Sequence, residues 1–217
     1  NLKFVKIDVS KDTIKLEKYF KEVDVVFHLA ALADIVPSIN NPKLYFSTNV
    51  TGTLNVLNAC IKNNIKKLVY AASASCYGLP KSFPTNEKNN ISLMYPYALT
   101  KKLGEDLILH WSQVYKLNVT SLRLFNVFGT RSRTSGAYGA VFGVFLAQRI
   151  NNKPLTIVGN GKQTRDFIYV KDVAEAFLKA SKLKKSGEII NIGSGKETSV
   201  NYIANMISNK KVYIPKR

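Results

Sequence analysis

The sequence is poor in the residues that build disulfide frameworks and metal sites. It contains two cysteines and two histidines in 217 residues. Cys60 and Cys76 are the only cysteines and show no zinc-ligand spacing, and a reduced setting is the default for so few cysteines. We therefore expect a reduced, cytoplasmic setting and no metal site.

Long apolar runs are also lacking, and the N-terminus shows no signal-peptide pattern. We expect no membrane partner. Repeats and low-complexity segments are absent as well. Hydrophobic residues nevertheless make up 46% of the chain and aromatic residues 11%, which is typical of a globular protein with a substantial core.

Acidic residues are scarce, since 14 Asp and Glu stand against 32 Lys and Arg, for a formal net charge of +18. Nucleic-acid binding is one interpretation of such an excess. However, the lysines are spread along the chain and no DNA- or RNA-binding motif accompanies them, so we expect no nucleic-acid partner. The excess could instead attract a polyanionic small ligand or reflect a lysine-biased genome.

Strand and helix patterns alternate along the chain. Strands are expected over 2–9, 24–31, 67–73, 119–128, 155–158, 188–192 and 211–215. Helices are expected over 11–22, with Ser10 as N-cap, within 42–63, and over 95–115, 137–151, 170–182 and 199–208. This alternation, with apolar strands, predicts an α/β fold with a doubly wound parallel sheet.

A glycine-rich phosphate loop is missing near the start, where such sheets that bind dinucleotides normally carry one. The glycines of Gly159-Asn-Gly161 and Gly193-Ser-Gly195 come late and in other contexts. We therefore expect this sequence to lack the first β-α-β unit of the fold.

A serine, a tyrosine and a lysine carry the clearest chemical signal. Ser73 ends the expected strand 67–73, and Tyr97 and Lys101 lie four residues apart at the start of the expected helix 95–115. At that spacing they share one helix face, where a lysine cation favours the phenolate of a neighbouring tyrosine. Such a phenolate can take a proton from a hydroxyl group, and Ser73 can hydrogen-bond the same oxygen.

The Tyr-x-x-x-Lys pattern occurs twice, so its context has to select one pair. Pro80 lies between Tyr77 and Lys81 and argues against a helix interior there. Pro96 precedes Tyr97, and helix-forming residues follow it, which favours a helix start. The motif alone also fits an ordinary surface Tyr–Lys pair on an amphipathic helix.

Several further motifs occur in a definite order and spacing. They are Asp8-Val9, His28-Leu-Ala-Ala31, Asn49-Val-Thr-Gly-Thr53, Ser73-Ala-Ser75-Cys-Tyr77-Gly78, Tyr97-x-x-x-Lys101, Arg123-Leu-Phe-Asn126-Val-Phe-Gly129 and Gln163-Thr-Arg165-Asp166. Together they resemble the extended short-chain dehydrogenase/reductases of the NAD-dependent nucleotide-sugar epimerase/dehydratase type, most closely the UDP-glucose and UDP-N-acetylglucosamine 4-epimerases. The resemblance covers essentially the whole sequence.

The resemblance implies a Rossmann-like NAD-binding domain over 1–128 and 167–193, truncated at its N-terminus. It also implies a substrate-binding subdomain over 129–166 and 194–217, truncated at its C-terminus. In the complete chain it implies a homodimer paired through the helices within 42–63 and 95–115.

The resemblance also implies roles for individual residues. The catalytic residues are Ser73, Tyr97 and Lys101. The NAD-binding residues are Asp8 and Val9 at the adenine, Leu29, Ala30, Ala31 and Leu32 along the channel, Thr48, Ala71, Tyr97, Lys101 at the nicotinamide ribose, and Phe125 near the nicotinamide. The residues that bind the UDP-sugar are Ser73, Ser75, Tyr97, Asn126 and Arg165, and segment 136–140 leads into the helix that covers the uridine.

Plainer interpretations stay open for several of these positions. Leu29–Leu32 also fits an ordinary strand end, Asn126 a turn cap, and Arg165 a local ion pair with Asp166. His28 is interpreted as a core histidine at the end of a strand, not as a catalyst.

The residues after Ser73 distinguish reactions within the resembled family. Dehydratases carry Asp-Glu at the next two positions, and decarboxylases carry Glu at the second, whereas this chain has Ala74 and Ser75. The sequence therefore favours NAD-dependent 4-epimerisation of a UDP-sugar through a transient 4-keto intermediate. The alternatives are a nucleotide-sugar reductase or dehydratase of the same family and a catalytically inactive nucleotide-binding fragment.

Overall fold

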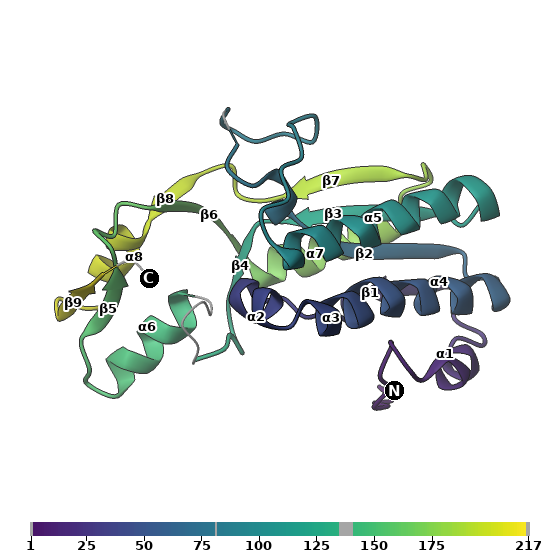
Figure 1. Cartoon of the computed structure of the whole chain (residues 1–217), viewed down its shortest axis with the longest axis horizontal. Helices are drawn as coiled ribbons and strands as arrows, with labels where there is room; N and C mark the ends of the chain where they lie inside the picture. Colours follow the sequence, from purple (N-terminus) through teal and green to yellow (C-terminus); the bar gives the residue numbers. More distant parts are fainter. Residues whose placement is uncertain (1, 81, 135–140, 216–217) are drawn as a thin grey trace. The chain divides into compact units, whose positions relative to one another are not determined.

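The computed structural model describes residues 2–80, 82–134 and 141–215 (Figure 1). The chain forms two compact units. The first unit consists of Asn1–Leu124 and Ala176–Asn191, and the second of Phe125–Glu175 and Ile192–Arg217. These junctions differ from the predicted boundaries 1–128 with 167–193 and 129–166 with 194–217. The NAD-binding and substrate-binding roles of the two parts stay predictions.

A four-stranded sheet forms the centre of the first unit, in the order β1 (Val25–His28), β2 (Lys67–Ser73), β3 (Val119–Leu124) and β7 (Glu188–Ile192). Strand β2 pairs in parallel with β1 and with β3, and the registers set His28 opposite Tyr70 and Ser73 opposite Leu124. Strand β2 is buried along nearly all its length, as a central parallel strand requires.

Helices cover both faces of this sheet. Successive residues of a strand point to opposite faces. In β1, His28 reaches Thr53 of α4 (Gly52–Lys62), whereas Phe27 makes an edge-to-face contact with Phe177 of α7 (Val170–Ser181). The predicted α/β fold with a doubly wound sheet is therefore confirmed.

The core of the first unit lies between the sheet and the helices α4 and α5 (Pro96–Tyr115). Leu57, Leu68, Ile108 and Val119 are completely buried in it. Each such side chain contributes about 1.5–3 kcal/mol of hydrophobic stabilisation. Gly104 of α5 allows a close approach, because an added Cβ would lie 2.2 Å from the Tyr70 hydroxyl.

The strand predicted over 2–9 is wrong. Residues 2–8 have no regular secondary structure, and Leu2 and Phe4 are almost fully exposed. Alternation gives a segment an apolar face, but a strand also needs a hydrogen-bonded neighbour, and none is present for this segment among the described residues. The following helix is shorter than predicted, since α1 covers Thr13–Tyr19, and Ser10 bonds Asp8 instead of capping it.

The long helix predicted within 42–63 contains an irregularity. It runs as α3 (Pro42–Tyr45), a π-helical segment over Phe46–Thr51, and α4, and it follows the unpredicted helix α2 (Ile35–Asn40). π-Helical turns often occur at functional sites. Here the turn contains Asn49, which is buried.

The second unit contains two small sheets. Strands β4 (Asn126–Phe128), β6 (Thr164–Tyr169) and β8 (Glu197–Ser199) form one, and β5 (Leu155–Val158) and β9 (Lys211–Ile214) form the other. Helices α6 (Val141–Ile150) and α8 (Val200–Ile207) pack with β5 around Phe145, Leu155, Ile157 and Ile203. The predicted strand 119–128 is split at Phe125, and β6 and β8, which have polar first halves, were not predicted.

Candidate active site

Ser73 lies where β2 ends, at the edge of the sheet where ligands of open α/β folds bind. The short 3₁₀ helix η2 (Ala74–Tyr77) follows immediately, and the Ser73 hydroxyl caps it by accepting the Ser75 N–H at 3.2 Å. The Ser75 hydroxyl oxygen is itself buried without a hydrogen-bond partner among the described residues. Both serines predicted to contact substrate therefore belong to one hydrogen-bonded turn.

Tyr97 lies in the first turn of α5, directly after Pro96. Its N–H donates to the Ser38 hydroxyl at 3.0 Å, and that hydroxyl donates to the Ile35 carbonyl at 2.5 Å. Ser38 is fully buried, so α2 holds the start of α5 in place. The Ser73 side chain lies close enough to the Tyr97 hydroxyl to lower its pKa, so the structure brings these two predicted catalytic residues together.

Lys101 is one turn further along α5 and is only 5% exposed. Its Nζ lies 4.3 Å from the centroid of the Tyr70 ring, and the Tyr70 hydroxyl donates to the Lys101 carbonyl at 3.3 Å. Burial lowers the pKa of Lys101 to about 7, against an opposing contribution from the Glu105 carboxylate. Among the described residues Lys101 has no ion pair, so its N–H donors are available to a ligand.

The pKa of Tyr97 corrects one prediction. Burial raises this pKa above its ordinary value; the Ser73 side chain lowers it, and Tyr45 and Asp34 raise it further. None of these groups is a cation. The structure therefore favours the neutral phenol, and the stabilisation of the phenolate by Lys101 that the spacing predicted is not seen here.

The segment Leu29–Leu32 follows β1 at the same edge of the sheet, with Leu29 and Ala30 exposed. Asn49, which is 1% exposed, holds its end: the Leu32 N–H donates to Asn49 Oδ1 at 2.8 Å, and Asn49 Nδ2 donates to the Leu32 carbonyl at 3.0 Å. Asn49 Nδ2 also donates to Thr100 Oγ1 at 3.0 Å, one residue before Lys101. Asn49 thus ties the predicted cofactor channel to the predicted catalytic helix.

The roles of Asn49 and Ser38 were missed by sequence reasoning. Asn49 had a signal, because it begins one of the motifs on which the resemblance rests, although no role was attached to it. Ser38 lies outside every motif, so no sequence pattern pointed to its role.

His28 is confirmed as a core histidine. Its Nε2 lies 2.9 Å from Thr53 Oγ1, and the Thr53 hydroxyl donates to the Asn49 carbonyl at 2.6 Å. Burial lowers the pKa of His28 to about 3, with a smaller contribution from Lys101. His28 is therefore neutral and helps to shape the Asn49 turn.

The other predicted NAD-binding residues of the first unit are spread over three elements. Asp8 accepts hydrogen bonds from Ser10, which lower its carboxyl pKa. Val9 packs on Gly52, where an added Cβ would lie 2.8 Å from the valine Cγ2. Thr48 is half-buried in the π-helical segment, and Ala71 is buried in β2. Their contacts with NAD stay predictions.

The second unit contains the other predicted ligand-binding residues. Asn126 and Arg165 come from the paired strands β4 and β6, with Asn126 in register with Phe167, two residues after Arg165. Asn126 Nδ2 donates to the Asp166 carbonyl at 2.9 Å, so it links strands and does not cap a turn. Phe125 is half-buried and donates its N–H to the Ile192 carbonyl.

The alternative ion pair between Arg165 and Asp166 does not form. The Asp166 carboxylate accepts the N–H groups of Ser194 and Gly195 at 2.7 and 2.9 Å, while Arg165 Nη1 donates to the Thr164 carbonyl. Arg165 is exposed and has no ion pair within the described part of the chain. The predicted segment 136–140 lies outside the described residues.

In the part of the chain that the structure describes, no helix is long and apolar enough to cross a membrane. The described residues also contain no group of three or more His, Cys, Asp or Glu side chains that could hold a metal ion.

Comparison with known proteins defines the family. Residues 1–193 match the model of the NAD dependent epimerase/dehydratase family, so the chain belongs to that family. It is 39% identical over 208 residues to a putative UDP-glucose 4-epimerase of Methanocaldococcus jannaschii, covering 95% of this chain and 67% of the relative. It is 35% identical over 217 residues to a UDP-N-acetyl-alpha-D-glucosaminuronate decarboxylase of Bacillus cytotoxicus, covering 94% of this chain and 66% of the relative.

A solved structure agrees with this assignment. The UDP-glucose 4-epimerase of Thermotoga maritima, determined with UDP-glucose, is 32% identical and superposes with a TM-score of 0.93, covering 100% of this chain and 72% of that structure. The chain thus spans about two thirds of the length of the relatives that it matches.

NAD is the cofactor of this family, and the described residues fit it. The exposed, small-residue segment after β1 lets backbone approach a ligand, and the buried Lys101 has free donors for ribose hydroxyls. The segment after β1 lies at the edge of the parallel sheet where dinucleotides bind in such folds.

Proposed function

We propose that the protein containing this chain catalyses NAD-dependent 4-epimerisation of a UDP-sugar. The observation that supports this most directly is the proximity of the Tyr97 and Ser73 side chains, one helical turn from the buried Lys101. A phenol, a hydroxyl and an ammonium in this arrangement suit the removal and return of a proton at a sugar hydroxyl.

Each of the three side chains has a distinct task in this proposal. Tyr97 takes the proton of the sugar 4-hydroxyl as the C4 hydride leaves, and returns it after the hydride has been restored to the opposite face. Ser73 donates a hydrogen bond to the same oxygen as it becomes a carbonyl. Lys101 binds the nicotinamide ribose. NAD, when bound, supplies the nicotinamide that accepts and returns the hydride.

The raised pKa of Tyr97 adds a condition to this mechanism. The chain alone favours the neutral phenol, so Tyr97 acts as a base only when positive charge comes close to it. Lys101 can supply that charge when its ammonium is retained. Because burial brings the Lys101 pKa to about 7, ligand groups that accept its hydrogen bonds would help it to stay protonated.

The turn after Ser73 supports epimerisation over elimination. Ala74 and Ser75 occupy the positions where the resembled dehydratases and decarboxylases carry carboxylates, and η2 contains no acidic residue. The decarboxylase among the relatives makes loss of carbon dioxide the competing reaction. For the nucleotide diphosphate we propose Asn126 and Arg165, since an exposed guanidinium suits phosphate oxygens.

Product analysis tests this proposal. The full-length natural polypeptide that contains this sequence should convert UDP-glucose to UDP-galactose, or their N-acetylated forms into each other, giving an isomer of unchanged mass. Mass spectrometry that shows loss of water or of carbon dioxide would contradict the epimerase assignment.

A further inference from the structure

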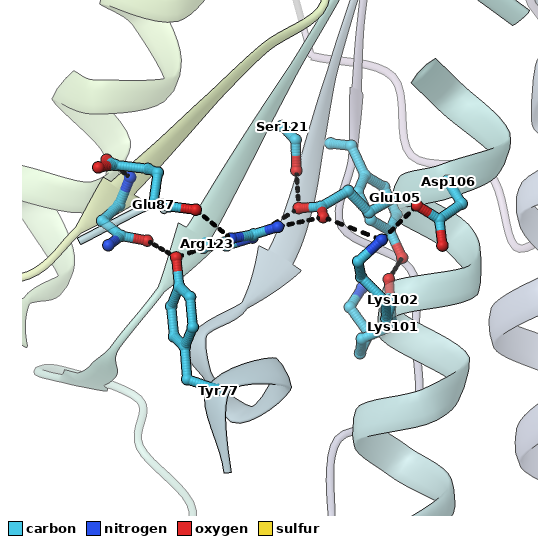
Figure 2. Close-up of polar contacts among 10 residues, drawn as sticks. Tyr77, Glu87, Lys101, Lys102, Glu105, Asp106, Ser121 and Arg123 are labelled. Carbon is cyan, nitrogen blue, oxygen red and sulfur yellow. Dashed lines mark hydrogen bonds and ion pairs between the residues drawn. The ribbon is translucent and has the colours of Figure 1, made fainter. Parts of the chain in front are cut away.

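A buried ion pair lies one turn beyond Lys101 on α5. Arg123 of β3 donates from Nη2 to Glu105 Oε1 at 2.7 Å and from Nε to Glu105 Oε2 at 3.0 Å (Figure 2). Ser121 donates to the same Oε2 at 2.8 Å. Glu105 is 1% and Arg123 3% exposed, so this two-pronged pair is shielded from water.

The remaining nitrogen of the guanidinium faces the turn that follows Ser73. Arg123 Nη1 donates to the Tyr77 hydroxyl at 2.7 Å, and the guanidinium carbon lies 5.0 Å from the Tyr77 ring centroid. Tyr77 is the last residue of η2, the helix that Ser73 caps. One side chain therefore links η2 to α5.

The contacts continue from Tyr77 to the edge strand. The Tyr77 hydroxyl donates to Asn191 Oδ1 at 2.8 Å, and the Asn191 N–H donates to Glu87 Oε1 at 2.7 Å. Asn191 Nδ2 donates to the Thr85 carbonyl at 3.1 Å. The network thus also holds the loop between η2 and α5 against β7.

Stability alone does not account for such a pair. Removing two charges from water costs free energy that their attraction often fails to recover, and well-packed apolar residues can replace a buried pair without loss of stability. A fixed two-pronged geometry does supply exact placement of the elements it joins. Those elements carry Ser73 and Ser75 on one side and Tyr97 and Lys101 on the other.

We propose that Glu105, Arg123 and Tyr77 form a positioning network, which holds the Ser73–Ser75 turn in register with the Tyr97–Lys101 face of α5. These residues position reacting groups through other residues and need not touch substrate. The catalytic consequence rests on the proposed function, whereas the placement of the turn does not.

Cysteine labelling tests the placement without any activity. Cys76 lies in η2 next to Tyr77 and is 2% exposed, whereas Cys60 is buried in α4 and serves as the internal reference. In the full-length polypeptide, Tyr77→Phe should increase the labelling rate of Cys76 by about tenfold through local opening, with little change for Cys60. An equal change in the labelling rates of the two cysteines, or no change in either rate, would overturn the proposal.

A paired substitution separates positioning from stability. Glu105→Leu alone should lower both stability and kcat, because it leaves the Arg123 charge buried and unpaired. Glu105→Leu with Arg123→Met should restore most of the thermal stability, yet leave kcat at least about tenfold below wild type with KM little changed. Recovery of kcat together with stability would show that the pair is only structural.

A matched control is available elsewhere on the same sheet. Lys67 is 3% exposed, and its Nζ donates to Asn118 Oδ1 and to the Leu183 carbonyl, at the first residue of β2. Lys67→Met should lower stability and leave kcat unchanged.

If the wild-type polypeptide has no epimerase activity, the proposed function fails, while Cys76 labelling still decides whether the network positions the turn.

Discussion

The two units of this chain present their candidate ligand-binding groups in opposite ways. In the first unit, Lys101 is buried, and the surrounding groups Asn49, Ser38 and Glu105 are buried and hydrogen-bonded as well. In the second unit, Asn126 and Arg165 are exposed, and among the described residues their side chains bond only to main-chain carbonyls. Under the proposed function, the first unit supplies a prearranged reaction centre, whereas the second supplies exposed groups that bind a charged ligand.

The largest effect is expected at the reaction centre. Tyr97→Phe removes only the hydroxyl that transfers the proton, so kcat should fall by about 10²–10⁴-fold while the dissociation constant for the UDP-sugar changes little. Tyr95→Phe is the matched control, because Tyr95 lies two residues earlier and is one of the exposed aromatic residues. Wild-type turnover in Tyr97→Phe, measured by interconversion of UDP-glucose and UDP-galactose, would remove Tyr97 as the base.

The second effect tests whether the first unit is prearranged by buried polar groups. Asn49→Ala leaves the Leu32 N–H and carbonyl and the Thr100 hydroxyl without this partner. We expect the free energy of unfolding to fall by about 3 kcal/mol, measured by urea denaturation. Asn58→Ala, at an exposed position of α4, should change it little. Equal losses in the two variants would contradict the role given to Asn49.

The third effect concerns the exposed groups of the second unit. Arg165→Ala should raise KM for the UDP-sugar by about 10- to 100-fold, because a charged hydrogen bond to phosphate is worth about 1.5–3 kcal/mol, and should leave kcat nearly unchanged. Arg149→Ala, at another exposed arginine of the same unit, is the control. A fall in kcat with unchanged KM would place Arg165 with the reaction centre and break the comparison.

The smallest effect is a pH dependence of stability in the first unit. The folded pKa of His28 is about 3 against an ordinary value of 6.5, so the unfolded state binds more protons between these values. The contribution of His28 is therefore fully present above pH 6.5 and is lost as the pH falls toward 3, by about 1.4 kcal/mol per pH unit. Urea denaturation at pH 7 and pH 5 measures it.

The control for this pH dependence uses the second histidine. His28→Gln should flatten the fall in stability between pH 7 and pH 5, whereas His110→Gln, at an exposed position of α5, should leave the wild-type slope. Parallel slopes in wild type and His28→Gln would show that His28 is not held neutral by burial.

Sequence patterns predicted several strands in which apolar residues predominate. The strands 67–73, 155–158 and 188–192 have the predicted bounds. The prediction of a strand over 2–9 is wrong, and β6 was not predicted, for related reasons. Residues 2–8 alternate but have no neighbouring strand among the described residues, and β6 begins with the polar Thr164-Arg165-Asp166, whose pairing with β8 no local pattern signals.

For the site, the sequence alone determined which residues can do chemistry and which of them share a face. The four-residue spacing of Tyr97 and Lys101 needs only the geometry of a helix, and the position of Ser73 only the end of an apolar strand. The tertiary structure determines how the pKa of each group shifts, because burial and all neighbouring groups act on it. Burial raises the pKa of Tyr97, where the spacing predicted a decrease. The tertiary structure also determines which residues hold these groups in place. The hydrogen bonds come from residues that are distant in sequence, namely Asn49, Ser38 and the Glu105–Arg123 pair. Only the packed chain brings such partners within hydrogen-bond distance.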